Sequence, residues 1–275
     1  MAAGRAVESR RTRPLVSDPY AQAFVDTAGL DVALPGTASA DPTSDRGWEE
    51  MATYQGVRSR FFDEFFTGAV GAGIRQVVLL AAGLDARAFR LAWPDGVTVY
   101  EIDQPAVLAF KDEVLEARSA GAAARRVPVT VDLREDWPAA LTPAGFDASQ
   151  PTAWLAEGLL PYLPAAAEAA LFEHIDALSA SGSRIAVEHF AADMAALDRH
   201  PHLAHMNNTL GLDVRDLFYP EPREQAPESF LAALGWKPAT VNARDLAVAY
   251  QRPLPDDVAE LMGQVALLEA ERLTA

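Results

Sequence analysis

A small-residue turn and two strand-end aspartates are the features of this sequence best suited to chemistry. The stretch LLAAGLDARAFRL, residues 79–91, ends an apolar run in Ala81, Ala82 and Gly83. A ligand can approach the backbone closely at such a turn, and a helix that follows it would offer N–H groups. Taken alone, the turn is equally compatible with a plain strand-to-helix corner.

The spacing of the two aspartates indicates which ligand the turn would hold. Asp103 ends VTVYEID, about twenty residues beyond the turn, where an acid can accept hydrogen bonds from both ribose hydroxyls. Asp132, in the VDL that ends the next apolar run, could accept one from an adenine amino group. The phosphate-binding fingerprint G-x-G-x-x-G is missing, because Gly83 is the only glycine of this turn. An adenosine without phosphates predicts S-adenosylmethionine and disfavours a nicotinamide-dependent reductase.

Alternating apolar runs and helical patterns predict the fold that would position these residues. Short apolar runs bounded by helical segments are typical of strands buried on both faces of a parallel sheet. We therefore expect an α/β protein with a doubly wound, mostly parallel sheet. The expected strands are QVVLLA, VTVYEID, RVPVTVDL, PTAWLAEGLLPYL, SRIAVEHF and KPATVNA.

The other segments predict one domain with additions. Residues 1–74 read as a helical N-terminal cap in which 34–47 form a mobile loop, and residues 75–190 as the cofactor-binding core. Residues 191–228 are irregular and are predicted to be a lid insertion. Residues 229–275 complete the core and are predicted to end in a helix from Asp256 to Leu273.

Composition excludes several classes of function. The 275 residues carry a formal net charge of −16, which disfavours nucleic acid and anionic membranes as partners. The chain has no cysteine, so disulfides, thiolate metal sites and cysteine nucleophiles are excluded. With neither a secretory signal nor a membrane-spanning run, a cytoplasmic protein is expected.

Several ordered motifs together resemble the leucine carboxyl methyltransferase-like family, whose members include polyketide carboxyl O-methyltransferases. The resemblance covers most of the chain and implies a Rossmann-like class I methyltransferase fold with S-adenosylmethionine as the cofactor. It also implies an antiparallel seventh strand near the C-terminus. The pattern predicts a helix there instead, so the strand is either lost or supplied by VNARDLAVAY. The motifs are RAVES, SDPYAQAFV, YQGVRSRFFDEFF, LLAAGLDARAFRL, VYEIDQP, VTVDLRE, WLAEGLLPYL and GWKP followed by YQRPLP.

The resemblance implies a set of cofactor-binding residues. Arg58 would bind the carboxylate of the methionine part, since its guanidinium fork suits a carboxylate. Arg5 would be a second cation, a place that Arg10, Arg11 or Arg13 could also fill. Ala81 stands where the family usually has the first glycine of its turn, and an alanine there is costly if φ is positive. The full implied set is Arg5, Arg58, Ala81, Gly83, Asp103, Gln104, Asp132, Leu133, Glu157 and Gly158.

Two residues are candidates for the catalytic step. Tyr162 follows the fourth strand and either orients the substrate or simply packs. His189 ends the fifth strand and is a candidate general base, with a structural histidine as the equal alternative. Asp85 and Arg87 are interpreted as first-turn residues of the helix after the turn, and Glu101 as a paired structural charge.

The remaining histidines invite a metal site that their spacing does not support. Asp198, His200, His202 and His205 show neither a helical nor a zinc pattern, and a substrate lid is the preferred interpretation.

The sequence therefore predicts an O-methyltransferase that acts on a carboxylate of a small molecule, such as a polyketide-like natural product. A carboxylate is already ionised near neutral pH and needs no strong base. The alternatives are methylation of a phenol or alcohol with His189 as base, methylation of a protein's C-terminal carboxylate, and a binding protein that has kept the fold.

Overall fold

The computed structural model describes residues 1–29, 42–190, 218–219, 221 and 223–273. Within it the chain divides into two compact units. The first unit comprises residues 1–61, 190–220 and 241–266, and the second comprises 62–189, 221–240 and 267–275.

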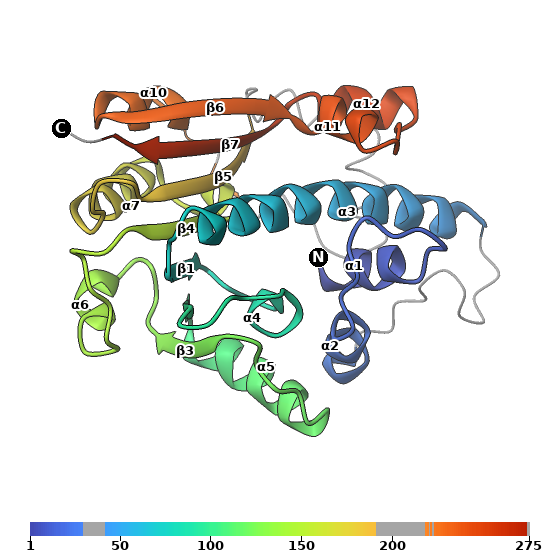
Figure 1. Ribbon diagram of the computed structural model, residues 1–275. Coiled ribbons are helices and arrows are strands. Elements are labelled where there is room, and N and C mark those ends of the chain that lie inside the picture. The colour runs from blue at the N-terminus through green and yellow to red at the C-terminus, as the bar shows by residue number, and fades with distance from the viewer. Residues whose placement is uncertain (30–41, 191–217, 220, 222, 274–275) are drawn as a thin grey trace. The chain divides into compact units, whose positions relative to one another are not determined.

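A seven-stranded sheet organises the fold and confirms the predicted α/β class (Figure 1). Its strand order is β3-β2-β1-β4-β5-β7-β6, and the pairs β1–β2, β1–β4, β2–β3 and β4–β5 are parallel. The order reverses direction between β1 and β4, as expected for a doubly wound sheet. The strands are β1 (Gln76–Leu80), β2 (Thr98–Asp103), β3 (Arg125–Thr130), β4 (Thr152–Ala156), β5 (Arg184–Phe190), β6 (Trp236–Asn242) and β7 (Val265–Arg272).

The C-terminal strand corrects one sequence prediction. The helix expected over 256–273 ends early: α12 is Asp256–Met262, and VALLEAER forms β7. Hydrogen bonds from Gly182 N to Arg272 O and from Arg272 N to Ser183 O join the end of β7 to the start of β5. This strand is therefore antiparallel to β5, and Figure 1 shows it running opposite to β6. Leucine, alanine and glutamate favour a helix, but pairing with two strands outweighs that weak preference. VNARDLAVAY instead supplies α11 (Ala243–Ala249).

The central strands of the second unit are buried on both faces, and one face carries a large apolar cluster. Val78, Tyr100 and Trp154 of three neighbouring strands are at most 2 % exposed. Together with side chains of α6 (Trp137–Leu141), α7 (Ala165–Ala177) and α10 (Pro227–Ala233) they form one apolar cluster. Fully removing such side chains from water gains about 1.5–3 kcal/mol each, which holds the strands in register.

The opposite face of the sheet carries a buried charge cluster. Glu101 is fully buried on β2, and its carboxylate lies 2.8 Å from Lys111 Nζ and 2.7 Å from Arg126 Nε. Lys111 belongs to α5 (Pro105–Ala117), so this helix packs on that face. The interpretation of Glu101 as a paired structural charge is confirmed.

The N-terminal part is helical, as predicted, with α1 (Ala2–Ser9), α2 (Ala21–Ala28) and the long α3 (Pro42–Gly71). The long helix begins at Pro42, inside the stretch expected to be a loop, because proline is tolerated in the first turn of a helix. Residues 34–41 of that predicted loop lie outside the described ranges.

The first unit depends on one buried acid, Glu8 of the RAVES motif. Glu8 is 0 % exposed; one carboxylate oxygen accepts from Leu15 N at 2.6 Å and the other from Arg11 Nη1 at 2.7 Å. Burial raises the pKa of Glu8, although these donors oppose the rise. The acid packs against Gly56 of α3, where a Cβ would lie 2.8 Å from Glu8 Cδ.

Among the described residues no helix combines the length and apolar character needed to cross a membrane.

Gly56→Ala should destabilise the protein by about 1–3 kcal/mol, because the new methyl group overlaps a carboxylate that two donors hold in place. Urea unfolding would measure this change.

Gly68→Ala in the same helix is the matched control, since the nearest atom to its Cβ is Arg184 Nη1 at 3.9 Å. It should leave stability unchanged or raise it by up to about 1 kcal/mol, as alanine favours a helix over glycine. Equal effects of the two substitutions would contradict the packing of Glu8 on α3.

Candidate functional site

The carboxyl ends of β1, β2, β3 and β4 bring most of the predicted cofactor residues together. Leu80 of β1 pairs with Ile102 of β2 on one side and with Ala156 of β4 on the other. The residues that follow these positions, Ala81 and Glu157 among them, therefore leave the sheet at the same level. This is also where the strand order reverses, the usual ligand position in a doubly wound sheet.

The turn after β1 has an unusual backbone at Ala81. Its φ is +52°, a left-handed conformation that residues other than glycine rarely adopt. Gly83 also has a positive φ, +48°, and Ala82 N donates to Ile102 O at 3.0 Å. The φ of Ala81 is therefore positive, which is the conformation in which alanine is less favourable than glycine.

Asp103 holds this turn to the end of β2. One of its carboxylate oxygens accepts from Gly83 N at 2.6 Å, and the other accepts from Gln104 N at 2.7 Å. Since Asp103 is only partly buried, its carboxylate remains within reach of a ligand. The acid whose distance from the turn suggested a ribose acceptor therefore lies against the small-residue turn.

Asp132 lies after β3 and is tied to its neighbours. Gln104 Nε2 donates to Asp132 Oδ2 at 3.0 Å, so the two predicted cofactor residues are in contact. Arg134 binds both oxygens of Asp132, with Nε 2.9 Å from Oδ1 and Nη2 2.6 Å from Oδ2. Hydrogen bonds from the Arg134 side chain and main chain bring the pKa of Asp132 down to about 2. Leu133 packs against the apolar cluster of the second unit.

Glu157 follows β4 and is held by a residue that the sequence analysis did not select. Arg87 Nη1 lies 2.6 Å from Glu157 Oε2, and the two side chains are 3 % and 11 % exposed. The next residue, Gly158, has a φ of +63°. Arg87 belongs to α4 (Arg87–Arg90), the short helix after the turn at Ala81.

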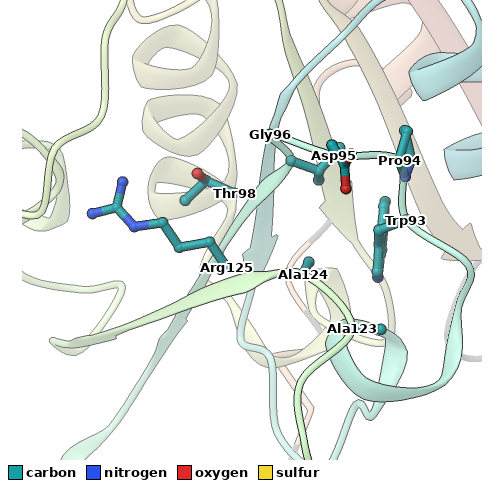
Figure 2. A pocket seen from close by; sticks show the side chains of 9 residues that line it. Trp93, Pro94, Asp95, Gly96, Thr98, Ala123, Ala124 and Arg125 are labelled. Carbon is teal, nitrogen blue, oxygen red and sulfur yellow. The ribbon is translucent and has the colours of Figure 1, made fainter.

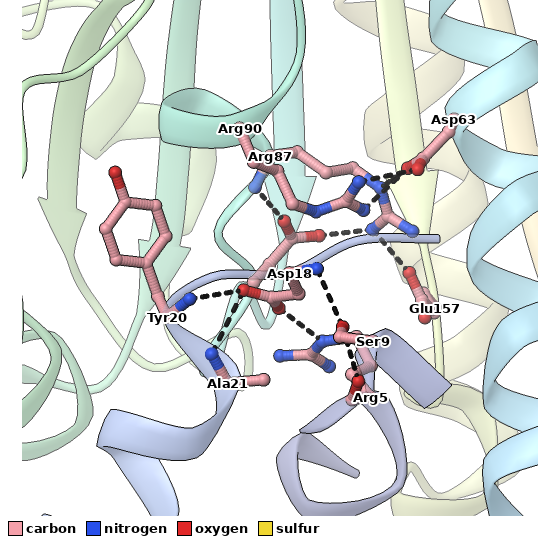
Figure 3. Close-up of polar contacts among 10 residues, drawn as sticks. Arg5, Ser9, Asp18, Tyr20, Ala21, Asp63, Arg87, Arg90 and Glu157 are labelled. Carbon is pink, nitrogen blue, oxygen red and sulfur yellow. Dashed lines mark hydrogen bonds and ion pairs between the residues drawn. The ribbon is translucent and has the colours of Figure 1, made fainter. Parts of the chain in front are cut away.

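Arg87 is the centre of a buried charge cluster, drawn with its partners in Figure 3. Its Nε donates to Asp63 Oδ1 at 2.7 Å, and its Nη1 also contacts the carboxylate of Asp85. Burial disfavours the charged guanidinium, but the carboxylates of Asp85, Glu157 and Asp63 outweigh this and raise the pKa of Arg87. Burial raises the pKa of Asp85, but the charges of Arg87, Lys111 and Arg90 together with the hydrogen bond from Arg87 N outweigh it and bring the pKa down to about 2.

The predicted role of Asp85 is confirmed only in part. Its Oδ1 accepts from Arg87 N at 2.6 Å, as expected of an acid at the start of a helix. The contact of its second oxygen with the Arg87 side chain is a tertiary feature. A D-x-R pattern just after a strand-end turn is the only local signal for it in the sequence.

Arg5 and Arg58 belong to the first unit. Arg5 Nε donates to Asp18 Oδ2 at 2.8 Å, and the other oxygen of Asp18 accepts from Tyr20 N and Ala21 N at the start of α2 (Figure 3). Arg58 is 4 % exposed and lies 5.7 Å from the centre of the Tyr54 ring.

Two of the arginines considered in place of Arg5 have other contacts within the first unit, Arg11 through its side chain and Arg13 through its backbone oxygen. Arg11 pairs with Glu8 and with Glu49 Oε2, while Arg13 O accepts from Arg252.

The two catalytic candidates differ in exposure. Tyr162 ends the 3₁₀ turn η1 (Leu160–Tyr162) and is 44 % exposed. His189 lies on β5 and is 5 % exposed, with its Nε2 3.2 Å from Glu228 Oε2. Both lie in or beside the sheet of the second unit.

The predicted lid and metal candidates cannot be placed in the same way. Residues 191–217, which include Asp198, His200, His202 and His205, lie outside the described ranges. Among the residues that are described, no group of three or more His, Asp or Glu side chains could hold a metal ion.

A cavity of about 390 Å³ opens at the other end of the sheet (Figure 2). It lies at the amino ends of β2 and β3, between Trp93 to Thr98 and Ala123 to Arg125. Because ligands of doubly wound folds bind beyond the carboxyl ends of the strands, this cavity is not the candidate site.

The chemistry of the strand ends fits S-adenosylmethionine better than a dinucleotide. The side chains there are the carboxylates of Asp103, Asp132 and Glu157, which accept hydrogen bonds from hydroxyl, amino and ammonium groups. A pyrophosphate would be repelled by the same carboxylates. The turn from Ala81 to Gly83 leaves its backbone open to a ligand, because it carries only methyl groups and hydrogen.

Comparison with known sequences decides the family. The sequence model described as leucine carboxyl methyltransferase matches residues 1–176. The chain belongs to the leucine carboxyl methyltransferase family of S-adenosylmethionine-dependent methyltransferases. The resemblance recognised in the sequence motifs is thereby confirmed, and with it the cofactor and the class of enzyme.

Curated relatives agree with this family. A protein of Mycobacteroides abscessus is 49% identical over 264 residues, which are 93% of this chain and 85% of the relative. A Rhodococcus jostii protein is 50% identical over 261 residues, or 94% of this chain and 87% of the relative. Both carry the name "putative S-adenosyl-L-methionine-dependent methyltransferase".

Solved structures support the fold of this family member. A DUF574-family protein from Streptomyces avermitilis superposes with a TM-score of 0.56 at 15% identity, covering 98% of this chain and 96% of the other. A Thermobifida fusca protein, titled a "putative methyltransferase", gives a TM-score of 0.54 at 17% identity, covering 98% and 94%.

Ala81→Gly should keep or raise the stability of this methyltransferase. Glycine relieves the left-handed backbone by about 1–2 kcal/mol, and its greater freedom in the unfolded chain offsets about half of that gain. Chemical denaturation would measure the change. Ala82→Gly is the control, because Ala82 is buried without a positive φ and should lose about 1 kcal/mol. A clear loss of stability with Ala81→Gly would contradict the strained turn.

Asp103→Ala should weaken binding of S-adenosylmethionine by about a hundredfold or more, because it removes the acceptor beside the turn and a hydrogen bond that shapes it. Isothermal titration calorimetry would measure the affinity. Asp95→Ala is the matched control: it removes the same charge from an exposed position before the amino end of β2. Unchanged affinity in the Asp103 variant would disprove the ribose site.

Proposed function

We propose that this methyltransferase transfers the methyl group to a carboxylate oxygen of a small-molecule acid, such as a polyketide-like natural product. S-adenosylmethionine would supply a methyl group bonded to a sulfonium sulfur. An oxygen nucleophile attacks the methyl carbon in line with the carbon–sulfur bond, that bond breaks, and S-adenosylhomocysteine leaves as a neutral thioether. The protein then has to bind, align and desolvate its two substrates more than it has to activate them.

The proposed cofactor site runs along the strand ends of the second unit. Asp103 accepts from the ribose hydroxyls, while Asp132 with Gln104 and Leu133 borders the adenine. Glu157 and Gly158 would hold the amino-acid part of the cofactor, together with the backbone of the turn from Ala81 to Gly83. The resemblance to the family implies Arg5 and Arg58 as ligands of the cofactor's carboxylate, to which a guanidinium fork is suited, and these two assignments stay predictions.

The burial of His189 is the observation that favours a carboxylate as the methyl acceptor. A phenol or alcohol needs a base that can reach its proton, whereas a carboxylate is ionised already at neutral pH. His189 is almost entirely buried, and its Nε2 faces Glu228 rather than solvent. The other histidine that the structure describes, His174, packs edge-on against Trp137 with ring centres 5.8 Å apart. The family's own description also names a carboxyl group as the methyl acceptor.

One observation favours a hydroxyl acceptor instead. Glu228 lies close enough to His189 to stabilise its protonated form, and a histidine beside a carboxylate is a common general base. In that case Tyr162 and His189 would flank the acceptor, with Tyr162 as the orienting residue.

The two functions separate by the product they form and by the effect of His189→Gln. The purified chain would be incubated with methyl-labelled S-adenosylmethionine and with matched acid and phenol pairs. A methyl ester releases its label in alkali, whereas a methyl ether retains it. We expect alkali-labile product from acids, and a change in kcat/KM of less than about threefold in His189→Gln.

The opposite result would be an alkali-stable product from the phenols, formed about 10²–10⁴-fold more slowly by His189→Gln. It would reverse the assignment in favour of the hydroxyl acceptor. Glu228→Gln serves as the companion variant, since it should lower phenol methylation only if His189 is the base.

A further inference from the structure

We propose that Arg87 is a positioning residue for the cofactor: it fixes the Glu157 carboxylate beyond β4, where that carboxylate receives the α-ammonium group of S-adenosylmethionine. The inference rests on the proposed function for the role of Glu157. Beyond the proposed function, it gives Arg87 a role that neither the sequence motifs nor the comparisons assign.

Arg87 contacts three carboxylates that come from three different segments of the second unit. One edge of the guanidinium holds Asp63 of α3 through Nε, at 2.7 Å. The Nη1 atom meets Glu157 at 2.6 Å and also contacts Asp85, which lies on the loop after the cofactor turn. Glu157 is thus connected through one side chain to both the turn after β1 and the helix α3.

The surroundings keep this connection rigid. Arg87 is 3 % exposed, and its guanidinium carbon lies 5.8 Å and 6.0 Å from the ring centres of Phe62 and Phe66. In this low-dielectric setting a charge-assisted hydrogen bond is stronger than it is at the surface. A lysine could not replace it, because an ammonium lacks the planar fork that reaches two partners at fixed angles.

The chemistry of Glu157 suits a cationic ligand group. Its carboxylate has two oxygens, and Arg87 Nη1 lies 2.6 Å from one of them, Oε2. A carboxylate held at the strand edge attracts an ammonium group. The α-ammonium group of S-adenosylmethionine has the charge and the donors that such a carboxylate accepts.

Arg90 supplies a matched control on the same short helix. It is 5 % exposed and binds both oxygens of Asp63, with Nη1 2.6 Å from Oδ2 and Nη2 2.7 Å from Oδ1. No contact between Arg90 and Glu157 is recorded among the described hydrogen bonds and ion pairs. Removing Arg90 therefore perturbs the same cluster and the same helix without releasing Glu157.

The test measures binding of two ligands to the full chain by titration calorimetry. S-adenosylmethionine carries the amino-acid part, whereas methylthioadenosine has the same adenosine without it. We expect Arg87→Met to weaken S-adenosylmethionine by about tenfold or more while methylthioadenosine changes by less than about twofold. Arg90→Met should change both ligands by less than about threefold. A role of Arg87 that is merely structural would weaken both ligands alike.

A double-mutant cycle with Glu157 tests the connection directly. In the Glu157→Gln background, Arg87→Met should cost less than about twofold in affinity for S-adenosylmethionine, since its effect acts through Glu157. If Arg87→Met does not fold, Arg87→Lys replaces it: it keeps the charge, and it should still lose affinity for S-adenosylmethionine selectively.

Three outcomes would overturn the proposal. These are equal losses for both ligands in the Arg87 variant, equal losses in the Arg87 and Arg90 variants, and additive effects in the cycle with Glu157. Failure of the unaltered protein to bind S-adenosylmethionine at all would instead refute the proposed function, and so the two failures are distinguishable.

Discussion

A single buried guanidinium, that of Arg87, joins the parts of the second unit on which the candidate site depends. It binds carboxylates from α3, from the loop after β1 and from the residue after β4. Buried ion pairs add little net stability, because the free energy of removing the charges from water offsets their attraction. Their removal one partner at a time is costly, however, because the remaining charges stay buried. Such a cluster therefore restricts the geometry of the site more than it stabilises the fold.

The sheet provides the frame for this cluster. Its strand order reverses between β1 and β4, and the register places Leu80 opposite both Ile102 and Ala156. The residues immediately beyond these positions must then diverge at one edge, where the turn at Ala81 and three acids follow the strands. Carboxylates at this edge suit the hydroxyl, amino and ammonium groups of S-adenosylmethionine.

Buried acids act as structural connectors elsewhere in the protein too. In the first unit Glu8 holds the loop at Leu15 and packs on Gly56 of α3, and Asp18 joins Arg5 to the start of α2. In the second unit Glu101 joins α5 and β3 to β2. The strongly acidic composition thus includes carboxylates with defined packing roles, besides those that face solvent.

The sequence by itself determined the fold class, six of the strands and the acids at the strand ends. Apolar runs and turn residues are local signals, and the family motifs added Glu157 and the two arginines. Local signals could not decide three features. VALLEAER forms a strand because β5 and β6 lie on either side of it, which no preference of leucine or alanine encodes. The positive φ of Ala81 follows from how the turn meets β2. Arg87 reads as an ordinary first-turn residue, and its partners Asp63 and Glu157 are distant in the chain. They come into contact only when α3 and β4 pack together. This tertiary packing places Arg87 at the centre of the buried charge cluster.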